Sequence, residues 1–184
     1  MREYAVVLLT AGLVTFLATP VVRLAAVRLH MMAAPRDRDV HVIPTPRWGG
    51  VAMYAGLLAA FAVEYILELA HVWPGPFSLA QGSGVNMLGV MIGITLIVIV
   101  GVIDDVQSLR PGVKFLGQII AAIVIASSGV LMSGFKIPLG DGRVVLGWLS
   151  YPVTVIYLVA FANIINLIDG LDGLAAGITG IGAC

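Results

Sequence analysis

The chain has 184 residues, of which 60% are hydrophobic and 11% charged, and its formal net charge is zero. Soluble domains are about 45–50% apolar and about 25% charged, so the composition argues against a soluble domain and favours a membrane protein. The balanced charge provides no general attraction for nucleic acid, and no nucleic-acid partner is predicted.

Five segments are long and apolar enough to cross a bilayer as helices, which takes about 20 residues each. They are residues 4–24, 48–70, 85–103, 115–133 and 147–168. A sixth apolar run begins near Leu171 and cannot finish before Cys184, so we expect the N-terminal part of a longer protein. The predicted fold class is an all-α polytopic membrane protein. It is a single integral-membrane domain over residues 1–184, with five complete transmembrane helices and a partial sixth.

Two of the connections between these spans carry local patterns. The segment FKIPLGDGRVVLG, residues 135–147, alternates apolar and polar residues around Asp141-Gly142, which predicts a β-hairpin on the outer face of the membrane. The segment HVWPGPFSLAQGSG, residues 71–84, is rich in proline, glycine and serine, and we expect it to be a loop.

The basic residues are divided unevenly between the two ends of the alternating spans. One end holds Arg23, Arg28, Arg36, Arg38, Arg47, Arg110 and Lys114, whereas the other holds only Arg2, Lys136 and Arg143. The positive-inside rule therefore places the amino terminus outside and the arginine-rich end in the cytoplasm. Most aspartates fall at the same end, so a site built from them would face the cytoplasm.

Asp104 and Asp105 lie together at the end of one span, in GVIDDVQSLRPGVK. Charges at helix ends are ordinary, but two adjacent ionised carboxylates repel each other and are stabilised by a cation. Mg²⁺ commonly takes one or two carboxylates and bridges to phosphate oxygens. The pair alone is a weak motif, compatible with a metal and phosphate site and also with a plain helix end.

The segment NIINLIDGLDGLAAG, residues 163–177, places two amides and two carboxylates in an apolar run. On a continuous helix Asp172 would point about 180° away from Asn163, so we expect the helix to break at Gly170 or the next glycine. Irregular backbone at membrane depth is tolerated where it lines a wet cavity. The alternative is that Asn163 and Asn166 only form hydrogen bonds to neighbouring helices.

Three segments together resemble the polyprenyl-phosphate N-acetylhexosamine-1-phosphate transferase family, the glycosyltransferase 4 family with MraY and WecA/TagO branches. The matching strings are DVHVIPTPRWGG (residues 39–50), GVIDDVQSLRPGVKFLGQ (101–118) and NIINLIDGLDGLAAG (163–177). Their order and spacing match the family over essentially the whole chain. The first string is more similar to the WecA/TagO branch, because MraY proteins typically have GTPTMGG there.

The resemblance implies a Mg²⁺-dependent phosphoglycosyl transferase of the bacterial plasma membrane, with Mn²⁺ as an alternative metal. The reaction would transfer N-acetylglucosamine-1-phosphate from UDP-N-acetylglucosamine, or a close UDP-N-acetylhexosamine, to undecaprenyl or decaprenyl phosphate. The products would be a polyprenyl-pyrophosphoryl sugar and UMP, in the first membrane step of cell-envelope polysaccharide synthesis. An MraY-type enzyme would instead use UDP-MurNAc-pentapeptide. Whether the protein forms a homodimer is left open.

The same resemblance implies roles for individual residues. The catalytic residues would be Asp104, Asp105, Lys114 and Asp169. One aspartate of the pair would deprotonate or orient the acceptor phosphate, and Lys114 would contact the pyrophosphate. The metal ligands would be Asn166, Asp104, Asp105 and Asp169. The substrate-binding residues would be Asn163, Gly170, Leu171, Asp172, Arg47 and His41, with Asp172 near uracil.

Family members are longer, and their second half supplies a further acidic metal ligand and a histidine-containing loop, so the 184 residues alone are expected to be inactive. Direct displacement is favoured over a covalent aspartyl intermediate. A CDP-alcohol phosphotransferase is one alternative function, but Gly177 stands where its D-x-x-D-G-x-x-A-R motif requires arginine. An ion-coupled transporter is another, although its site should lie near the middle of the bilayer.

Overall fold

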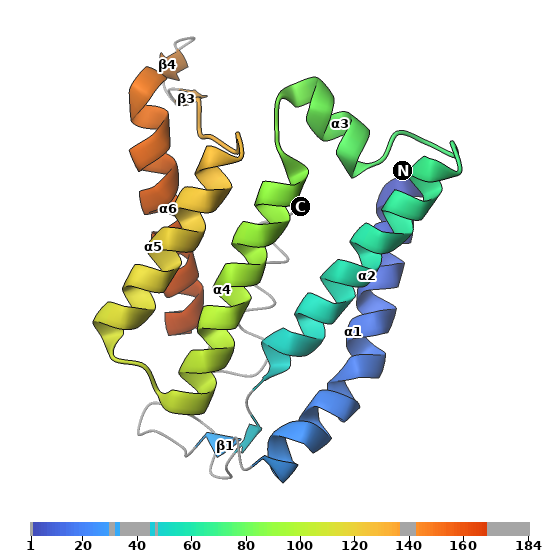
Figure 1. The fold of residues 1–184 in the computed structure, drawn as a ribbon, viewed down its shortest axis with the longest axis vertical. Helices are drawn as coiled ribbons and strands as arrows, with labels where there is room; N and C mark the ends of the chain where they lie inside the picture. The colour runs from blue at the N-terminus through green and yellow to red at the C-terminus, as the bar shows by residue number, and fades with distance from the viewer. Residues whose placement is uncertain (1, 30–31, 34–44, 47, 137–142, 169–184) are drawn as a thin grey trace.

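The computed structural model describes residues 2–29, 32–33, 45–46, 48–136 and 143–168, and these residues are mostly helical (Figure 1). Their elements in chain order are α1 (Arg2–Arg28), β1 (Met32–Ala33), β2 (Thr45–Pro46), α2 (Gly49–Leu69), α3 (Pro76–Ser83), α4 (Met87–Gln107), α5 (Pro111–Ser127), β3 (Gly134–Lys136), β4 (Arg143–Val145), the 3-10 turn η1 (Gly147–Leu149) and α6 (Ser150–Ile168).

Four of the five predicted spans are confirmed as helices long and apolar enough to cross a membrane: α1, α2, α4 and α6 together with η1. The fifth, α5, has 17 residues and a length of roughly 26 Å, and it both begins and ends earlier than the predicted 115–133. Its start is set by Pro111, which fits the first turn of a helix, and Gly129 with φ 93° follows its end. The predicted partial sixth span lies outside the described residues.

The connection over residues 71–84 contains helix α3, so the expectation of a loop was wrong. A proline occupies the first turn of α3, and Gly84 with φ 74° ends it in the left-handed region. The Glu68 carboxylate of α2 accepts the backbone N–H groups of Phe77 at 3.3 Å and Ser78 at 2.8 Å. A carboxylate from the preceding helix therefore caps α3, and the local sequence pattern does not reveal such a cap.

The interior of the described bundle is built from small side chains. Seven of its nine buried hydrophobic side chains are alanines, and none of the large described side chains is fully buried. Large apolar side chains such as Phe16 and Trp148 are instead 76% and 81% exposed. Helices surrounded by lipid pack through small residues, because burying large apolar groups brings no gain there. The packing is that of a multi-pass membrane protein.

The long helices alternate in direction, so the connections gather at two opposite ends (Figure 1). One end carries the antiparallel pair of β1 and β2 and the turn between α4 and α5. The other end carries α3 and the pair of β3 and β4, in which Phe135 lies opposite Val144. This pairing confirms the predicted hairpin, whose Asp141-Gly142 turn lies outside the described residues. The β1–β2 pair was not predicted, because strands of two residues show no periodicity.

Helix α5 packs between α4 and α6, while α1 packs along α2. Glycines allow the close approach of α5 to α4: a Cβ at Gly117 would lie 2.7 Å from Val100 Cγ2. The two groups of helices are linked by a hydrogen bond of 2.6 Å between Tyr54 of α2 and Thr95 of α4. The helices α4, α5 and α6 form the part of the bundle that carries the candidate site.

Candidate active site

A three-residue turn joins α4 to α5 and is held by Asp104. Ser108 ends α4 with φ 46°, and its N–H donates to the carbonyl oxygen of Asp104. The Asp104 side chain then accepts the N–H of Leu109 through Oδ1 at 3.1 Å. Arg110 precedes the first residue of α5. Because its carboxylate is bound to the turn, Asp104 has a defined position at the end of α4.

Asp104 also forms an ion pair with Lys114 of α5, with Lys114 Nζ 2.7 Å from Asp104 Oδ2. The two side chains are 24% and 21% exposed, so water screens the pair only in part. Each charge lies at the helix end that disfavours it, an acid near the C-terminus of α4 and a base near the N-terminus of α5. The helix dipoles do not explain these positions, whereas the turn that Asp104 holds and the ion pair do, and both charges are available to a site here.

Helix α6 contributes two amides to the same place. Lys114 Nζ donates to Asn166 Oδ1 at 3.3 Å, so a carboxylate oxygen from α4 and an amide oxygen from α6 converge on one ammonium group. Asn163, one turn earlier on the same helix face, donates from Nδ2 to Gln118 Oε1 of α5 at 2.7 Å. The same Nδ2 donates to the carbonyl oxygen of Val159 at 2.8 Å.

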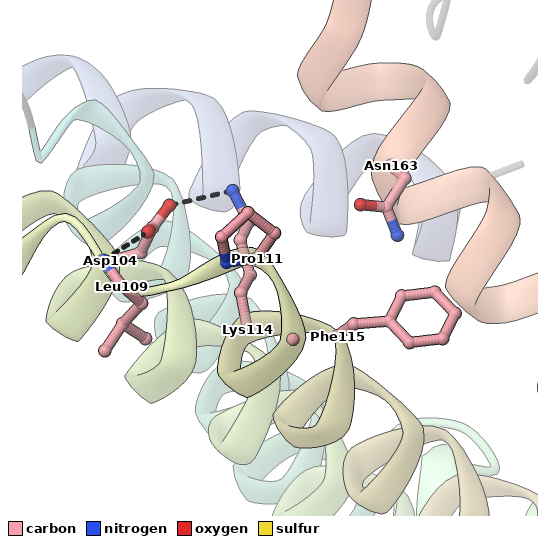
Figure 2. A pocket seen from close by; sticks show the side chains of 7 residues that line it. Asp104, Leu109, Pro111, Lys114, Phe115 and Asn163 are labelled. Atoms are coloured by element: carbon pink, nitrogen blue, oxygen red, sulfur yellow. Dashed lines mark hydrogen bonds and ion pairs between the residues drawn. The ribbon is translucent and has the colours of Figure 1, made fainter.

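A cavity of about 540 Å³ opens between these side chains (Figure 2), a size typical of ligand pockets. Its lining residues come from α4, the turn, α5 and α6: Asp104, Leu109, Pro111, Gly112, Lys114, Phe115 and Asn163. One acid, one base and one amide thus face a largely apolar hollow at the end of the bundle. Such a hollow can hold an anionic group beside the ammonium of Lys114.

The structure brings together four of the predicted site residues, Asp104, Lys114, Asn163 and Asn166. Asp105 lies beside Asp104 on α4 and is half-buried, but it is not among the described residues that line the cavity. Helix α6 is continuous through both asparagines. The expected break falls outside the described residues, as do six predicted site residues: His41, Arg47, Asp169, Gly170, Leu171 and Asp172.

Gln118 was not predicted, although it is 6% exposed and bonded to a predicted site residue. It lies one turn after Lys114 on the buried face of α5, where the other buried residues are alanines and Ile125. A single amide on such a face is the signal that could have identified it, because a buried amide needs a hydrogen-bond partner.

The donor set of the described residues fits part of a Mg²⁺ site. No group of three or more His, Cys, Asp or Glu side chains placed to hold a metal occurs within the ranges that the structure describes. However, Asp104 Oδ2 and Asn166 Oδ1 already converge on a positive group, and Mg²⁺ prefers such oxygens and often takes only one or two carboxylates. These two side chains could hold the ion together with further oxygen ligands.

Comparisons with known proteins give a matching family model and several relatives. A family model described as glycosyl transferase family 4 matches residues 87–184. Decaprenyl-phosphate N-acetylglucosaminephosphotransferase of Mycobacterium leprae is 44% identical over 181 residues, covering 97% of this chain and 44% of the relative. The probable undecaprenyl-phosphate N-acetylglucosaminyl 1-phosphate transferase of Bacillus subtilis is 35% identical over 182 residues, covering 99% and 47%.

A third relative, phospho-N-acetylmuramoyl-pentapeptide-transferase of Desulforudis audaxviator, is 33% identical over 204 residues, covering 96% of this chain and 58% of the relative. No solved structure matches the chain. The chain spans less than half the length of the first two relatives.

Proposed function

Because the chain belongs to glycosyl transferase family 4, we propose that it forms part of a membrane transferase for N-acetylglucosamine-1-phosphate. The donor is UDP-N-acetylglucosamine and the acceptor is decaprenyl or undecaprenyl phosphate, and the products are the polyprenyl-pyrophosphoryl sugar and UMP. The names of the relatives from M. leprae and B. subtilis support this choice. The observation that carries it is the Asp104–Lys114–Asn166 arrangement beside the cavity.

The reaction brings two anions together. An oxygen of the lipid phosphate attacks the sugar-bound phosphorus of the UDP-sugar, a new P–O bond forms, and the bond to UMP breaks. Such transfers depend on positioning and on neutralisation of phosphate charge more than on covalent chemistry. Lys114 supplies a positive charge at the cavity wall, and Asp104 is placed to orient the acceptor or to take its proton. The step is a direct displacement.

Mg²⁺ would be held by Asp104 and Asn166, with Asp105 and Asp169 completing the ligands, and Mn²⁺ could replace it. A bound divalent ion supplies charge neutralisation to the pyrophosphate. In the structure, Asp104 Oδ2 and Asn166 Oδ1 both accept hydrogen bonds from the ammonium group of Lys114. In the loaded site Lys114 would therefore bind substrate phosphate instead of protein oxygens.

The placement in the membrane and the extent of the protein are parts of the same proposal. The amino terminus lies outside, the site faces the cytoplasm, and the protein resides in the bacterial plasma membrane. The α4–α5 turn with Arg110 lies at the same end of the bundle as the C-terminal end of α1 with Arg28, and this gathering of basic residues supports the orientation (Figure 1). Residues 1–184 form one membrane domain of a longer transferase, because they span less than half of the first two relatives, and alone they are inactive.

The test is transfer of radiolabelled N-acetylglucosamine-1-phosphate from UDP-N-acetylglucosamine to polyprenyl phosphate by the complete protein in membranes. We expect label in the lipid, loss after EDTA treatment, recovery with Mg²⁺, and no transfer by the 184-residue chain alone. Turnover of UDP-MurNAc-pentapeptide instead would favour the function named for the D. audaxviator relative. No transfer from either donor would refute the proposal. A cysteine at Ser108 should be labelled only from the cytoplasmic side.

A further inference from the structure

Gln118 is a buried polar residue that the proposed chemistry does not use. Its side chain is 6% exposed, on the face of α5 that packs against the neighbouring helices. Burying an amide is unfavourable unless it is hydrogen-bonded, and Gln118 Oε1 accepts from Asn163 Nδ2 at 2.7 Å. The two residues are 45 positions apart in the chain, so this bond joins α5 to α6 beside the cavity.

The hydrogen bonds of Asn163 determine which way its amide faces. Nδ2 has two hydrogens, and it donates to two oxygens, the carbonyl of Val159 at 2.8 Å and Oε1 of Gln118. The carbonyl of Val159 can only accept, so a flipped amide would place Oδ1 against an oxygen. Figure 2 shows the consequence: Oδ1 of Asn163 lies on the side of Lys114, facing the cavity that Asn163 lines.

We propose that Gln118 is a positioning residue, which holds the Asn163 amide so that Oδ1 faces the cavity as an acceptor for a donor group of the nucleotide sugar. Val159 alone would hold only one of the two Nδ2 hydrogens. Gln118 supplies the acceptor for the second hydrogen and so keeps the Asn163 amide turned with Oδ1 towards the cavity before substrate binds. This inference deepens the proposed function and rests on it for the identity of the substrate.

The test compares two substitutions of similar size at Gln118 in the complete protein in membranes, because the 184 residues alone are expected to be inactive. Gln118→Met removes the acceptor, and Gln118→Glu keeps an acceptor oxygen at the same distance along the side chain. We expect Gln118→Met to raise the KM for UDP-N-acetylglucosamine about fivefold with kcat changed less than twofold, which corresponds to about 1 kcal/mol. In Gln118→Glu, the KM should stay within about twofold of the wild-type value. A fivefold higher KM in both variants would overturn the proposal.

Thr154→Val is the matched control for loss of a buried polar contact elsewhere on α6. Thr154 is 3% exposed, and its side chain accepts the N–H of Met132 at 2.8 Å near the start of α6, whereas Asn163 lies near the end of that helix. We expect Thr154→Val to lower the melting temperature without changing KM. If Gln118→Met also lowers only the melting temperature, Gln118 acts merely as a structural link and the proposal is wrong.

A double-mutant cycle separates action through Asn163 from independent action. Asn163→Ala should raise KM, and adding Gln118→Met to it should have no further effect, because the amide to be positioned is gone. Additive effects of the two substitutions would contradict the proposal.

A measurement without turnover keeps this inference separate from the proposed function. The 184 residues contain only three asparagines, Asn86, Asn163 and Asn166, so selective ¹⁵N labelling gives few side-chain amide signals in NMR, and the signal lost in Asn163→Ala is that of Asn163. We expect its Nδ2 protons to exchange with water more slowly in the wild type than in Gln118→Met. A silent wild-type enzyme would refute the function alone, whereas equal exchange rates in the two proteins would refute the role of Gln118.

Discussion

The contact between α4 and α5 predicts the result of adding one methyl group at Gly117. A Cβ there would lie 2.7 Å from Val100 Cγ2 and 3.2 Å from Cγ1, whereas carbon atoms normally pack about 3.5–4.0 Å apart. Valine in a helix is restricted to essentially one rotamer, so Val100 cannot turn away. Overpacking of this kind costs about 1–3 kcal/mol, and α5 must move away from α4.

Gly101→Ala is the matched control, because a Cβ at Gly101 would meet nothing within 4 Å. Both variants gain the same helix propensity, so the difference between them isolates the clash with Val100. At about 2–4 °C per kcal/mol, Gly117→Ala should unfold roughly 2–12 °C below Gly101→Ala. The three tryptophans allow unfolding in detergent to be followed by fluorescence.

The clash can also be relieved on the partner side. Val100→Ala combined with Gly117→Ala should recover most of the lost melting temperature, because the two atoms that meet the new Cβ are gone. Gly117 lies one turn after Lys114, so the movement of α5 should also lengthen the contact between Lys114 and Asp104 and lower activity. Equal melting temperatures for Gly117→Ala and Gly101→Ala would refute this account of the helix contact.

Two further substitutions probe the site and the opposite end of the bundle. Asp104→Asn should lower turnover by about 10²–10⁴-fold, as expected for loss of a proton-transfer or orienting group. The free energy of unfolding should change by only about 1 kcal/mol, because the ion pair with Lys114 is partly exposed. Steady-state kinetics and melting of the same sample decide this, with Glu3→Gln as the charge-matched control; unchanged turnover would contradict it. Glu68→Gln should weaken the cap of α3 by about 0.5–2 kcal/mol and speed amide exchange at Phe77 and Ser78. Unchanged exchange rates at these two amides would show that α3 does not depend on the charge.

The arrangement of the spans was predictable because hydrophobic length and charge placement act locally. Each long helix can be recognised from its own residues, and alternation then places Asp104, Lys114 and Asn166 at one end. A proline, Pro111, lies between Asp104 and Lys114, and it predicts a turn followed by a new helix. The sequence did not indicate that Asp104 and Lys114 form a direct ion pair.

The unpredicted features depend on contacts between distant residues. A lone amide on the apolar face of α5 indicates that Gln118 needs a hydrogen-bond partner, but the identity of that partner, Asn163, depends on how α6 packs beside α5. Helix α3 was missed because its N-terminal N–H groups are capped by Glu68 of the preceding helix and not by a neighbouring serine or aspartate. The role of Gln118 and the start of α3 therefore depend on contacts with distant residues, whereas the spans depend on local composition.

The three-residue turn between α4 and α5 has a consequence for biogenesis. So short a link cannot let the two helices insert at separate places, so they must leave the insertion machinery as an adjacent pair. Lys114 can therefore meet Asp104 without α6, which begins only at Ser150. The ion pair of the site can form before α6 brings its asparagines against it.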